Sequence, residues 1–247
     1  MGALEWTKAR VKQKMPMVAR AYRASQAVRR TLQNRFLSMD SVFSEIHRKN
    51  KWGNGESVSG AGSTLEATEM IRAQLPPLFK ELNLRSLLDA PCGDYNWMRE
   101  TPLELDSYFG MDIVPAIVAR NTQLYTRDGV RFLKGNLVED ALPRVDVILC
   151  RDCFNHLSFA AIAAALRNFK RSGATYALLT TDIFLKEAPD VIVGQSRSLN
   201  LEAAPLNLPP PVRLLFDGPR AAWNRSDVPE MVRGRHLGLW RLSDLSP

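Results

Sequence analysis

The sequence predicts an α/β fold with a doubly wound, mostly parallel sheet, preceded by a helical N-terminal extension. Short apolar runs alternate with helical stretches between residues 84 and 182, which is the pattern of parallel strands joined by crossover helices. Two late apolar runs, 212–217 and 237–242, have no helical stretch between them, so we expect an antiparallel hairpin that closes the sheet. The length of 247 residues suits one such domain with extensions.

The extension, residues 1–49, is expected to be helical and basic. Residues 1–35 contain nine Lys and Arg against one acidic residue, whereas the rest of the chain contains 24 basic and 25 acidic residues. Apolar residues recur at helical spacing within this basic arm, with an interruption at Pro16. Three interpretations stay open: attachment to an anionic membrane surface or polyanionic partner, a helix packed on the domain with its basic face in solvent, and a cleaved mitochondrial leader.

Residues 50–247 are expected to form the domain, which begins with a glycine-rich loop and a helix. The loop is a candidate lid over a ligand. Ser63 and Glu66 have the spacing of a capping box, which predicts that a helix starts there. Pro76 and Pro77 are expected to end that helix and to begin a second, shorter one.

From residue 84 onward the expected elements alternate regularly. Helices are expected at 114–124 and 158–171. The five expected strands, all rich in apolar residues, cover 85–90, 107–113, 130–136, 145–151 and 175–182. In an open parallel sheet the ligand binds beside the carboxyl ends of the strands, so the residues that follow these strands are the candidates for a site.

Two acidic residues mark the first two strand ends. Asp89 ends the first strand and Asp112 ends the second, 23 residues later, where a carboxylate suits the two ribose hydroxyls of an adenosine cofactor. A dinucleotide needs a G-x-G-x-x-G turn for its pyrophosphate, but here a proline and a cysteine precede the single Gly93. S-Adenosylmethionine has no phosphate, and Asp89 or Asp94 can supply a carboxylate for its ammonium group.

Three motifs carry a family resemblance: W-G-x-x-E-S-x-S-G-x-G-S at residues 52–63, D-x-P-C-G-D-x-x-W-M at 89–98 and R-D-x-x-x-H-L-S at 151–158. With them, residues 50–245 resemble class I S-adenosylmethionine-dependent methyltransferases, in particular a bacterial and viral group of uncharacterised members. The resemblance implies a seven-stranded Rossmann-like sheet in which the last hairpin inserts one antiparallel strand.

The resemblance also implies which residues hold the cofactor. The implied cofactor-binding residues are Asp89, Ala90, Cys92, Gly93, Asp94, Asp112, Ile113, Asn136 and Arg151. In this assignment Asp112 holds the ribose, Ile113 lies beside the adenine, and the turn after the first strand lines the methionine end. Asn136 departs from the family pattern, because an acid normally faces the adenine amino group there; the amide keeps an acceptor oxygen but carries no charge. Arg151 and Asp152 would lie next to the sulfonium and the substrate.

Methyl transfer from a sulfonium is an in-line displacement that alignment alone accelerates, but a weakly acidic acceptor also needs a base or a metal ion. His156, in the third motif, is the leading candidate for the base, with Asp152 nearby; the alternative is a histidine that only makes local hydrogen bonds. His47 and His236 are expected to be structural or surface residues. Asp152 and Asp182, which follow neighbouring strands, are an alternative Mg²⁺ site.

Arg197 and Asn200, after the fifth strand, are candidate substrate contacts. The expected reaction is O-methylation of a sugar hydroxyl in a glycolipid, polysaccharide or related small molecule. The alternatives are a protein or nucleic-acid methyltransferase and a non-catalytic cofactor-fold partner in a glycan-synthesis complex. Nucleic acid is disfavoured because the domain without its arm is close to neutral. Reduced cysteines and the lack of an apolar run of roughly 18 residues predict a cytoplasmic protein, with peripheral membrane attachment as an alternative.

Overall fold

The computed structural model describes residues 37–219, 229 and 234–245. The basic arm, residues 1–35, lies outside these described residues, and so do its expected helices and its expected membrane contact. The chain divides into two compact units, Met1–Ser38 and Met39–Pro247, and every element described below belongs to the second. None of the helices in the described ranges combines the length and the apolar character that a membrane span requires.

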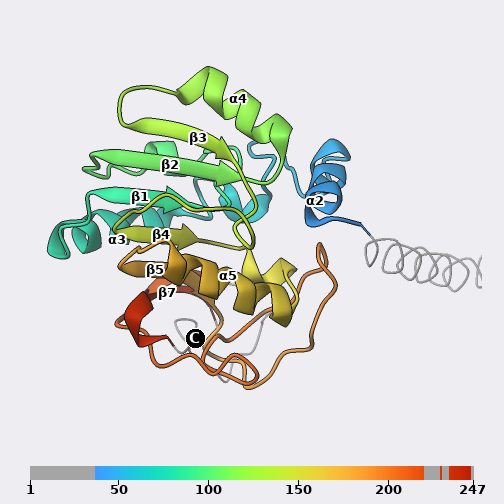
Figure 1. Cartoon of the computed structure of the whole chain (residues 1–247), viewed down its shortest axis with the longest axis vertical. Helices are drawn as coiled ribbons and strands as arrows, with labels where there is room; N and C mark the ends of the chain where they lie inside the picture. The colour runs from blue at the N-terminus through green and yellow to red at the C-terminus, as the bar shows by residue number, and fades with distance from the viewer. Residues whose placement is uncertain (1–36, 220–228, 230–233, 246–247) are drawn as a thin grey trace, which may run out of the picture. The chain divides into compact units, whose positions relative to one another are not determined.

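A seven-stranded sheet forms the centre of the second unit (Figure 1). Its strands are β1 (Ser86–Asp89), β2 (Ser107–Asp112), β3 (Val130–Lys134), β4 (Val147–Cys150), β5 (Tyr176–Thr181), β6 (Arg213–Gly218) and β7 (Arg235–Arg241). The order is β3-β2-β1-β4-β5-β7-β6, and β7 runs antiparallel to both of its neighbours. The chain passes from β3 on one side of β1 to β4 on the other side. This confirms the predicted doubly wound sheet with one antiparallel strand.

Helices connect the strands and cover the sheet. The described helices are α2 (Met39–Arg48), α3 (Glu69–Glu81), α4 (Pro115–Tyr125) and α5 (Phe159–Arg171), with short 3₁₀ helices η1 (Ala61–Ser63), η2 (Met98–Glu100), η3 (Phe154–His156) and η4 (Leu242–Asp244). Helix α4 begins at Pro115, whose missing N–H has no helical partner in the first turn in any case. Helix α5 begins after Ser158, whose Oγ accepts a hydrogen bond from the Ala161 N–H at 3.3 Å.

The predicted start of the helix after the glycine-rich loop was wrong. Helix α3 begins at Glu69, whereas the capping-box spacing placed its start at Ser63. The intervening residues form a separate turn, in which the hydroxyl of Thr64 accepts a hydrogen bond from the Ala67 N–H at 3.1 Å. This local hydrogen bond pairs the Ala67 N–H with a side chain, so the residues before Glu69 form a turn and the helix begins after it.

The predicted break at the two prolines was also wrong. Pro76 and Pro77 lie inside α3, which continues without interruption to Glu81. Two proline residues remove two backbone donors from the helix. The buried side chains of Leu75 and Leu78 lie on either side of them, so tertiary packing holds the helix together where its own hydrogen bonds are incomplete.

Both faces of the sheet are buried. Leu87 and its neighbour Leu88 on β1 are fully buried, and they belong to different core clusters because successive side chains of a strand point to opposite faces. Leu87 packs in the cluster that contains α3, and Leu88 packs in the cluster that contains α5. Because both faces of the sheet are covered, the candidate site residues lie where the strands end and not on a face of the sheet.

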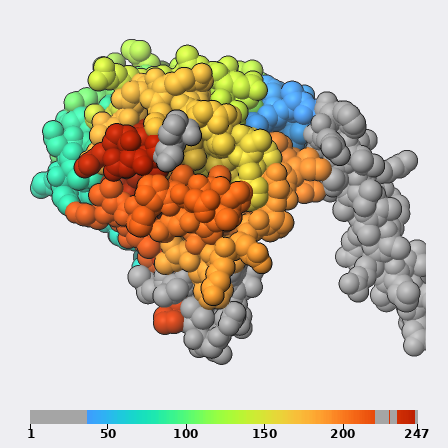
Figure 2. Space-filling view, turned by 60° about the horizontal axis from the view of Figure 1, so that its bottom comes forward, coloured from blue at the N-terminus to red at the C-terminus, as the bar shows by residue number. Residues whose placement is uncertain are grey.

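Helix α2 belongs to the same compact unit as the sheet, although its residues fall within the expected N-terminal extension, residues 1–49. Val42 and Ile46 are buried, and the Asp40 carboxylate lies 3.2 Å from the Lys134 ammonium at the end of β3. Figure 1 shows α2 beside the carboxyl ends of the strands. The irregular segment 182–212, drawn in orange, forms a broad layer on the face shown in Figure 2.

Candidate functional site

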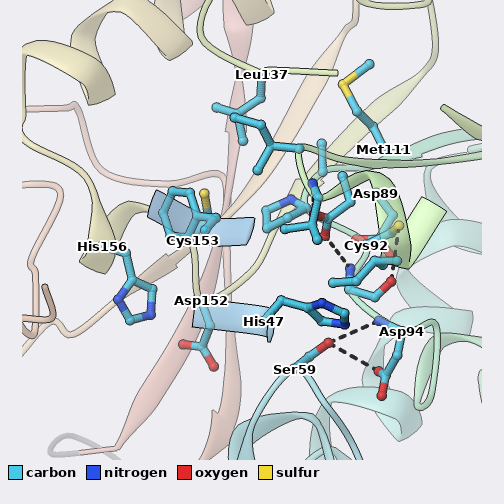
Figure 3. Close-up of a pocket in the computed structure, with 18 of the residues that line it drawn as sticks. His47, Ser59, Asp89, Cys92, Asp94, Met111, Leu137, Asp152, Cys153 and His156 are labelled. Atoms are coloured by element: carbon cyan, nitrogen blue, oxygen red, sulfur yellow. Dashed lines mark hydrogen bonds between the residues drawn. The ribbon is translucent and has the colours of Figure 1, made fainter. Parts of the chain in front are cut away.

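A cavity lies at the carboxyl ends of β1, β2 and β4. It is lined by all nine residues of the implied cofactor-binding set, together with Asp152 and His156. Figure 3 shows side chains from these separate segments converging on it. Within the described residues, Asp182, Arg197 and Asn200 lie outside its lining.

The turn after β1 is held against its neighbouring strands by backbone hydrogen bonds. The Ala90 N–H donates to the Leu149 carbonyl at 2.9 Å, and the Cys92 N–H donates to the Met111 carbonyl at 2.8 Å. Gly93 has a φ of +53°, in the left-handed region that glycine adopts without steric cost. A Cβ at this position would overlap Ser59 Oγ. The turn therefore needs its one glycine for both conformation and space.

Replacing Gly93 with alanine is expected to lower the free energy of unfolding by about 2–5 kcal/mol, because roughly 1–2 kcal/mol for the left-handed backbone adds to roughly 1–3 kcal/mol for the overlap with Ser59. Gly173→Ala is the matched control, since its φ is +77° but its Cβ would meet other atoms only at 3.8 Å. The measurement is urea-induced unfolding of both variants. Equal losses in the two would show that the overlap at Gly93 has no cost.

The carboxylate of Asp112 is buried at the end of β2. Its Oδ2 accepts the Gly93 N–H at 3.1 Å and its Oδ1 accepts the Val114 N–H at 2.9 Å. Burial raises the pKa of Asp112 to about 6, although these backbone hydrogen bonds act in the opposite direction. Each carboxylate oxygen has a second lone pair. Because Asp112 lines the cavity, these lone pairs can accept two ligand hydroxyls.

Asp89 ends β1 and is also buried. The Tyr108 hydroxyl donates to its Oδ2 at 2.8 Å. Burial raises the pKa of Asp89 to about 7, the Tyr108 hydrogen bond lowers it, and the nearby Asp112 raises it further. The carboxyl is therefore partly protonated near neutral pH, and a ligand ammonium beside it would favour the carboxylate form.

Apolar side chains surround the part of the cavity next to β2 and β3. Ile113, Val114 and Leu137 contribute to this wall, which suits a flat aromatic base. Asn136 also lines the cavity, and its Oδ1 accepts the Val138 N–H at 3.0 Å. The amide is therefore oriented by its own turn and retains one lone pair on its oxygen.

The glycine-rich loop, residues 52–63, is joined to the turn after β1. The Asp94 carboxylate accepts the hydroxyl of Ser57 at 3.1 Å and the hydroxyl of Ser59 at 3.2 Å. In the other direction, the Asp94 N–H donates to Ser59 Oγ at 3.0 Å (Figure 3). These bonds explain two of the three serines of the first motif, Ser57 and Ser59, and the aspartate that follows the glycine in the second motif.

Arg151 connects the cavity wall to the last hairpin. Its Nε and Nη2 donate to the two carboxylate oxygens of Asp217 at 2.9 and 3.1 Å, and its Nη1 donates to the Gly62 carbonyl at 2.9 Å. The guanidinium carbon lies 5.2 Å from the centre of the Trp97 ring. Asp217 is fully buried and also accepts Arg235 Nε at 2.6 Å. One carboxylate therefore pairs with two buried arginines.

The candidate magnesium ligands have other partners. Asp152 Oδ2 accepts Arg235 Nη1 at 2.8 Å and lies 3.7 Å from Arg151 Nη1. Asp182 Oδ2 accepts the Leu199 N–H at 3.1 Å. Among the residues that the structure describes, no three His, Cys, Asp or Glu side chains are grouped to hold a metal ion. The two guanidinium groups beside Asp152 would repel a divalent cation, so the donor set fits Mg²⁺ poorly.

His156 is held by local contacts. Its Nδ1 lies 2.8 Å from the Gln195 carbonyl oxygen, and its Nε2 lies 3.2 Å from Asn155 Nδ2. A carbonyl only accepts and an amide NH₂ donates, so these partners assign the proton to Nδ1 and leave Nε2 as an acceptor. The ring stacks on Trp52 with centroids 4.6 Å apart. This geometry is that of the local alternative considered for His156.

The two candidate substrate contacts support the segment between β5 and β6. Arg197 Nη1 donates to the Leu157 carbonyl at 2.7 Å, and its guanidinium lies 4.5 Å from the centre of the Phe159 ring. Asn200 Nδ2 donates to the Leu185 carbonyl at 2.8 Å. Both side chains therefore stabilise the irregular segment outside the cavity.

Several residues of the site carry no sequence signal for it. Helix α2 contributes Met39, Phe43, Ile46 and His47 to the cavity lining, but its amphipathic pattern predicts only a helix. Arg235 and Asp217 lie in the late strands without a motif. The sequence contains one indirect signal for Asp217. Arg151 follows a buried strand, and a buried arginine needs a carboxylate partner elsewhere in the chain.

No protein-family model matches this chain, and no curated protein matches it either. The fold is similar to that of N-methyltransferase NodS from Bradyrhizobium japonicum WM9 with bound S-adenosylhomocysteine (TM-score 0.57, 11% identity, 81% of this chain and 97% of that one). It is also similar to magnesium protoporphyrin IX methyltransferase from Synechocystis PCC 6803 with bound S-adenosylmethionine (TM-score 0.54, 10% identity, 82% of this chain and 96% of that one). A third similar structure is human N-acetylserotonin methyltransferase with bound S-adenosylmethionine (TM-score 0.51, 13% identity, 88% of this chain and 64% of that one). At these identities the similarity establishes the fold.

Proposed function

We propose that this chain is an S-adenosylmethionine-dependent methyltransferase. The observation that carries the proposal is the position of Asp112, a buried carboxylate in the cavity that also accepts the N–H of Gly93. A carboxylate at the end of the second strand is the partner that a ribose diol needs. The turn after β1 contains Pro91 and Cys92, so it lacks the open backbone that binds a pyrophosphate. The cofactor that fits both features is an adenosine without phosphates.

The similar structures support this proposal in one respect. Two of them are described with S-adenosylmethionine and one with S-adenosylhomocysteine, and they share this fold at low identity. Because ligands of open α/β sheets bind at the carboxyl ends of the strands, a cavity at that position is the expected cofactor site here as well.

For the acceptor we propose a sugar hydroxyl of a glycolipid, polysaccharide or related small molecule. Trp52 lines the cavity and is 37% exposed, so its indole offers an apolar face against which a sugar ring can pack. Attachment of the basic arm to an anionic membrane would bring the protein close to glycolipids. Sedimentation of the full chain with anionic vesicles, lost at high salt, tests this attachment.

The reaction itself is tested with methyl-tritiated S-adenosylmethionine. The full chain and a cell extract are incubated with it, and lipids, polysaccharides, proteins and nucleic acids are then separated. We expect label in the lipid or polysaccharide fraction, and we expect it to resist mild alkali, because a methyl ether is stable where a methyl ester is cleaved. Label in protein or nucleic acid would replace the proposed acceptor by one of those. Incorporation no higher than without the protein would contradict methyltransferase activity.

A further inference from the structure

The side chains that can exchange a proton in the cavity differ in their contacts. Among the described residues, its lining includes four aspartates, two cysteines, one arginine and two histidines. A group that takes the proton of a bound hydroxyl needs a lone pair that is not already engaged and that faces the ligand. The contacts of each side chain therefore decide which of them is suited to this step.

The four aspartates are already engaged. Asp94 accepts two serine hydroxyls, and Asp112 accepts two backbone N–H groups. Asp152 is paired with Arg235 at 2.8 Å. Asp89 is only 3% exposed, accepts the Tyr108 hydroxyl, and lies at the methionine end of the proposed cofactor site. Each of the four is therefore already committed to a protein partner or to the proposed cofactor.

The two thiols and His156 are also poorly suited. Burial raises the pKa of Cys92 well above its usual value, and Cys153 is a buried thiol. His156 has one ring nitrogen at the Gln195 carbonyl and the other at the Asn155 amide. The ring also stacks on Trp52, so it would have to break several contacts before it could accept a proton.

His47 is different. It is half-buried on α2, it lines the cavity, and its imidazole makes no hydrogen bond or ion pair with another described residue. Figure 3 shows it between Asp152 and Asp94, and both of these also line the cavity. The buried side chains of Val42 and Ile46 fix the helix that carries it. Within the described residues, the structure thus presents an imidazole without a hydrogen bond in the lining of the proposed cofactor site.

We infer that His47 is the catalytic base that takes the proton of the methyl acceptor; the inference rests on the proposed methyltransferase function and assigns a residue to it. In the reaction, a lone pair of the acceptor oxygen forms a bond to the methyl carbon. The bond between that carbon and sulfur breaks, and its electron pair stays on sulfur, which becomes a neutral thioether. The hydroxyl proton passes to an imidazole nitrogen of His47 and then to water.

The first test uses the full chain with His47→Ala and the fraction that the wild type labels. Turnover is expected to fall roughly 10²–10⁴-fold. S-Adenosylhomocysteine affinity, measured by calorimetry, is expected to stay within about threefold, because the loss concerns the reaction and not cofactor binding. Added imidazole is expected to restore part of the rate, which a structural role of His47 would not allow. Arg48→Ala, an exposed change on the same helix, controls for general damage to α2.

The second test needs no acceptor. Diethyl pyrocarbonate modifies accessible histidines, and saturating S-adenosylhomocysteine is expected to slow modification of His47 at least roughly tenfold, because the ligand fills the cavity. In Asp112→Ala this protection is expected to need more ligand. The inference is overturned if the ligand binds without protecting His47, or if His156→Ala loses turnover and responds to imidazole while His47→Ala does neither. If the wild type binds no S-adenosylhomocysteine, the proposed function itself fails.

Discussion

The Asp217→Asn variant is expected to lose about 3–5 kcal/mol of unfolding free energy, the usual cost of breaking a buried ion pair by removing one partner. Asp217 is fully buried and accepts Arg151 Nε at 2.9 Å and Arg235 Nε at 2.6 Å. An asparagine of the same shape supplies no negative charge, and its NH₂ group would face a guanidinium. Both arginines would then be buried without their shared counter-ion.

The matched control is Glu81→Gln. Glu81 pairs with Arg213 on β6 at 2.6 Å, but both side chains are about half exposed. The same change from carboxylate to amide is expected to cost less than about 1 kcal/mol there, because water screens an exposed pair. Urea unfolding followed by circular dichroism measures both variants. Similar losses in the two would show that the buried network adds no stability beyond a surface pair.

Asp112→Ala is expected to weaken S-adenosylhomocysteine binding by about 3–6 kcal/mol, or roughly 10²–10⁴-fold, because two charge-assisted hydrogen bonds to the ribose hydroxyls are lost at about 1.5–3 kcal/mol each. The variant also leaves the Gly93 and Val114 N–H groups without their carboxylate partner. Part of the effect can therefore come from a loosened turn, and unfolding of the variant is measured in parallel.

Asp128→Ala is the matched control for this prediction. Asp128 is exposed in the turn before β3 and does not belong to the described cavity lining, so its removal is expected to leave the affinity within about threefold. Unchanged affinity in Asp112→Ala would show that its carboxylate does not hold the cofactor, even if the cofactor binds elsewhere in the cavity.

The strand pattern was readable in the sequence for a physical reason. Because the sheet is covered on both faces, β4 is a continuous apolar run and β1 has two leucines at its centre, and both stand out between polar turns. The late hairpin could be predicted because no helical stretch separates its two strands. Its insertion order, with β7 between β5 and β6, came from the family resemblance.

The helices were harder to predict, because tertiary packing decided their limits. Local propensity breaks a helix at Pro76, yet the burial of Leu75 and Leu78 keeps α3 continuous. Residues 1–49 were expected to be a helical extension, but no local feature shows that α2 packs at the strand ends. Its role in the cavity wall could therefore not be read from the sequence.

The site was predictable where it depends on strand ends and unpredictable where it depends on distant partners. Asp89 and Asp112 end their strands, so their place in the cavity could be inferred. Arg151 and Asp217 are 66 positions apart, and Asp152 and Arg235 are 83 apart, so no spacing rule links them. The contacts that engage His156 likewise come from Gln195, 39 positions away. Only the folded chain shows that, among the described residues, this imidazole has hydrogen-bond partners while that of His47 has none.

The central claim is that the cavity binds an adenosine cofactor without a pyrophosphate. Calorimetric titration of the full wild-type chain with S-adenosylhomocysteine and, separately, with NAD⁺ tests it most directly. We expect one S-adenosylhomocysteine to bind per chain and NAD⁺ to give no binding heat, because the turn at Pro91 and Cys92 leaves no open backbone for a pyrophosphate. Binding of NAD⁺ without binding of S-adenosylhomocysteine would contradict the account.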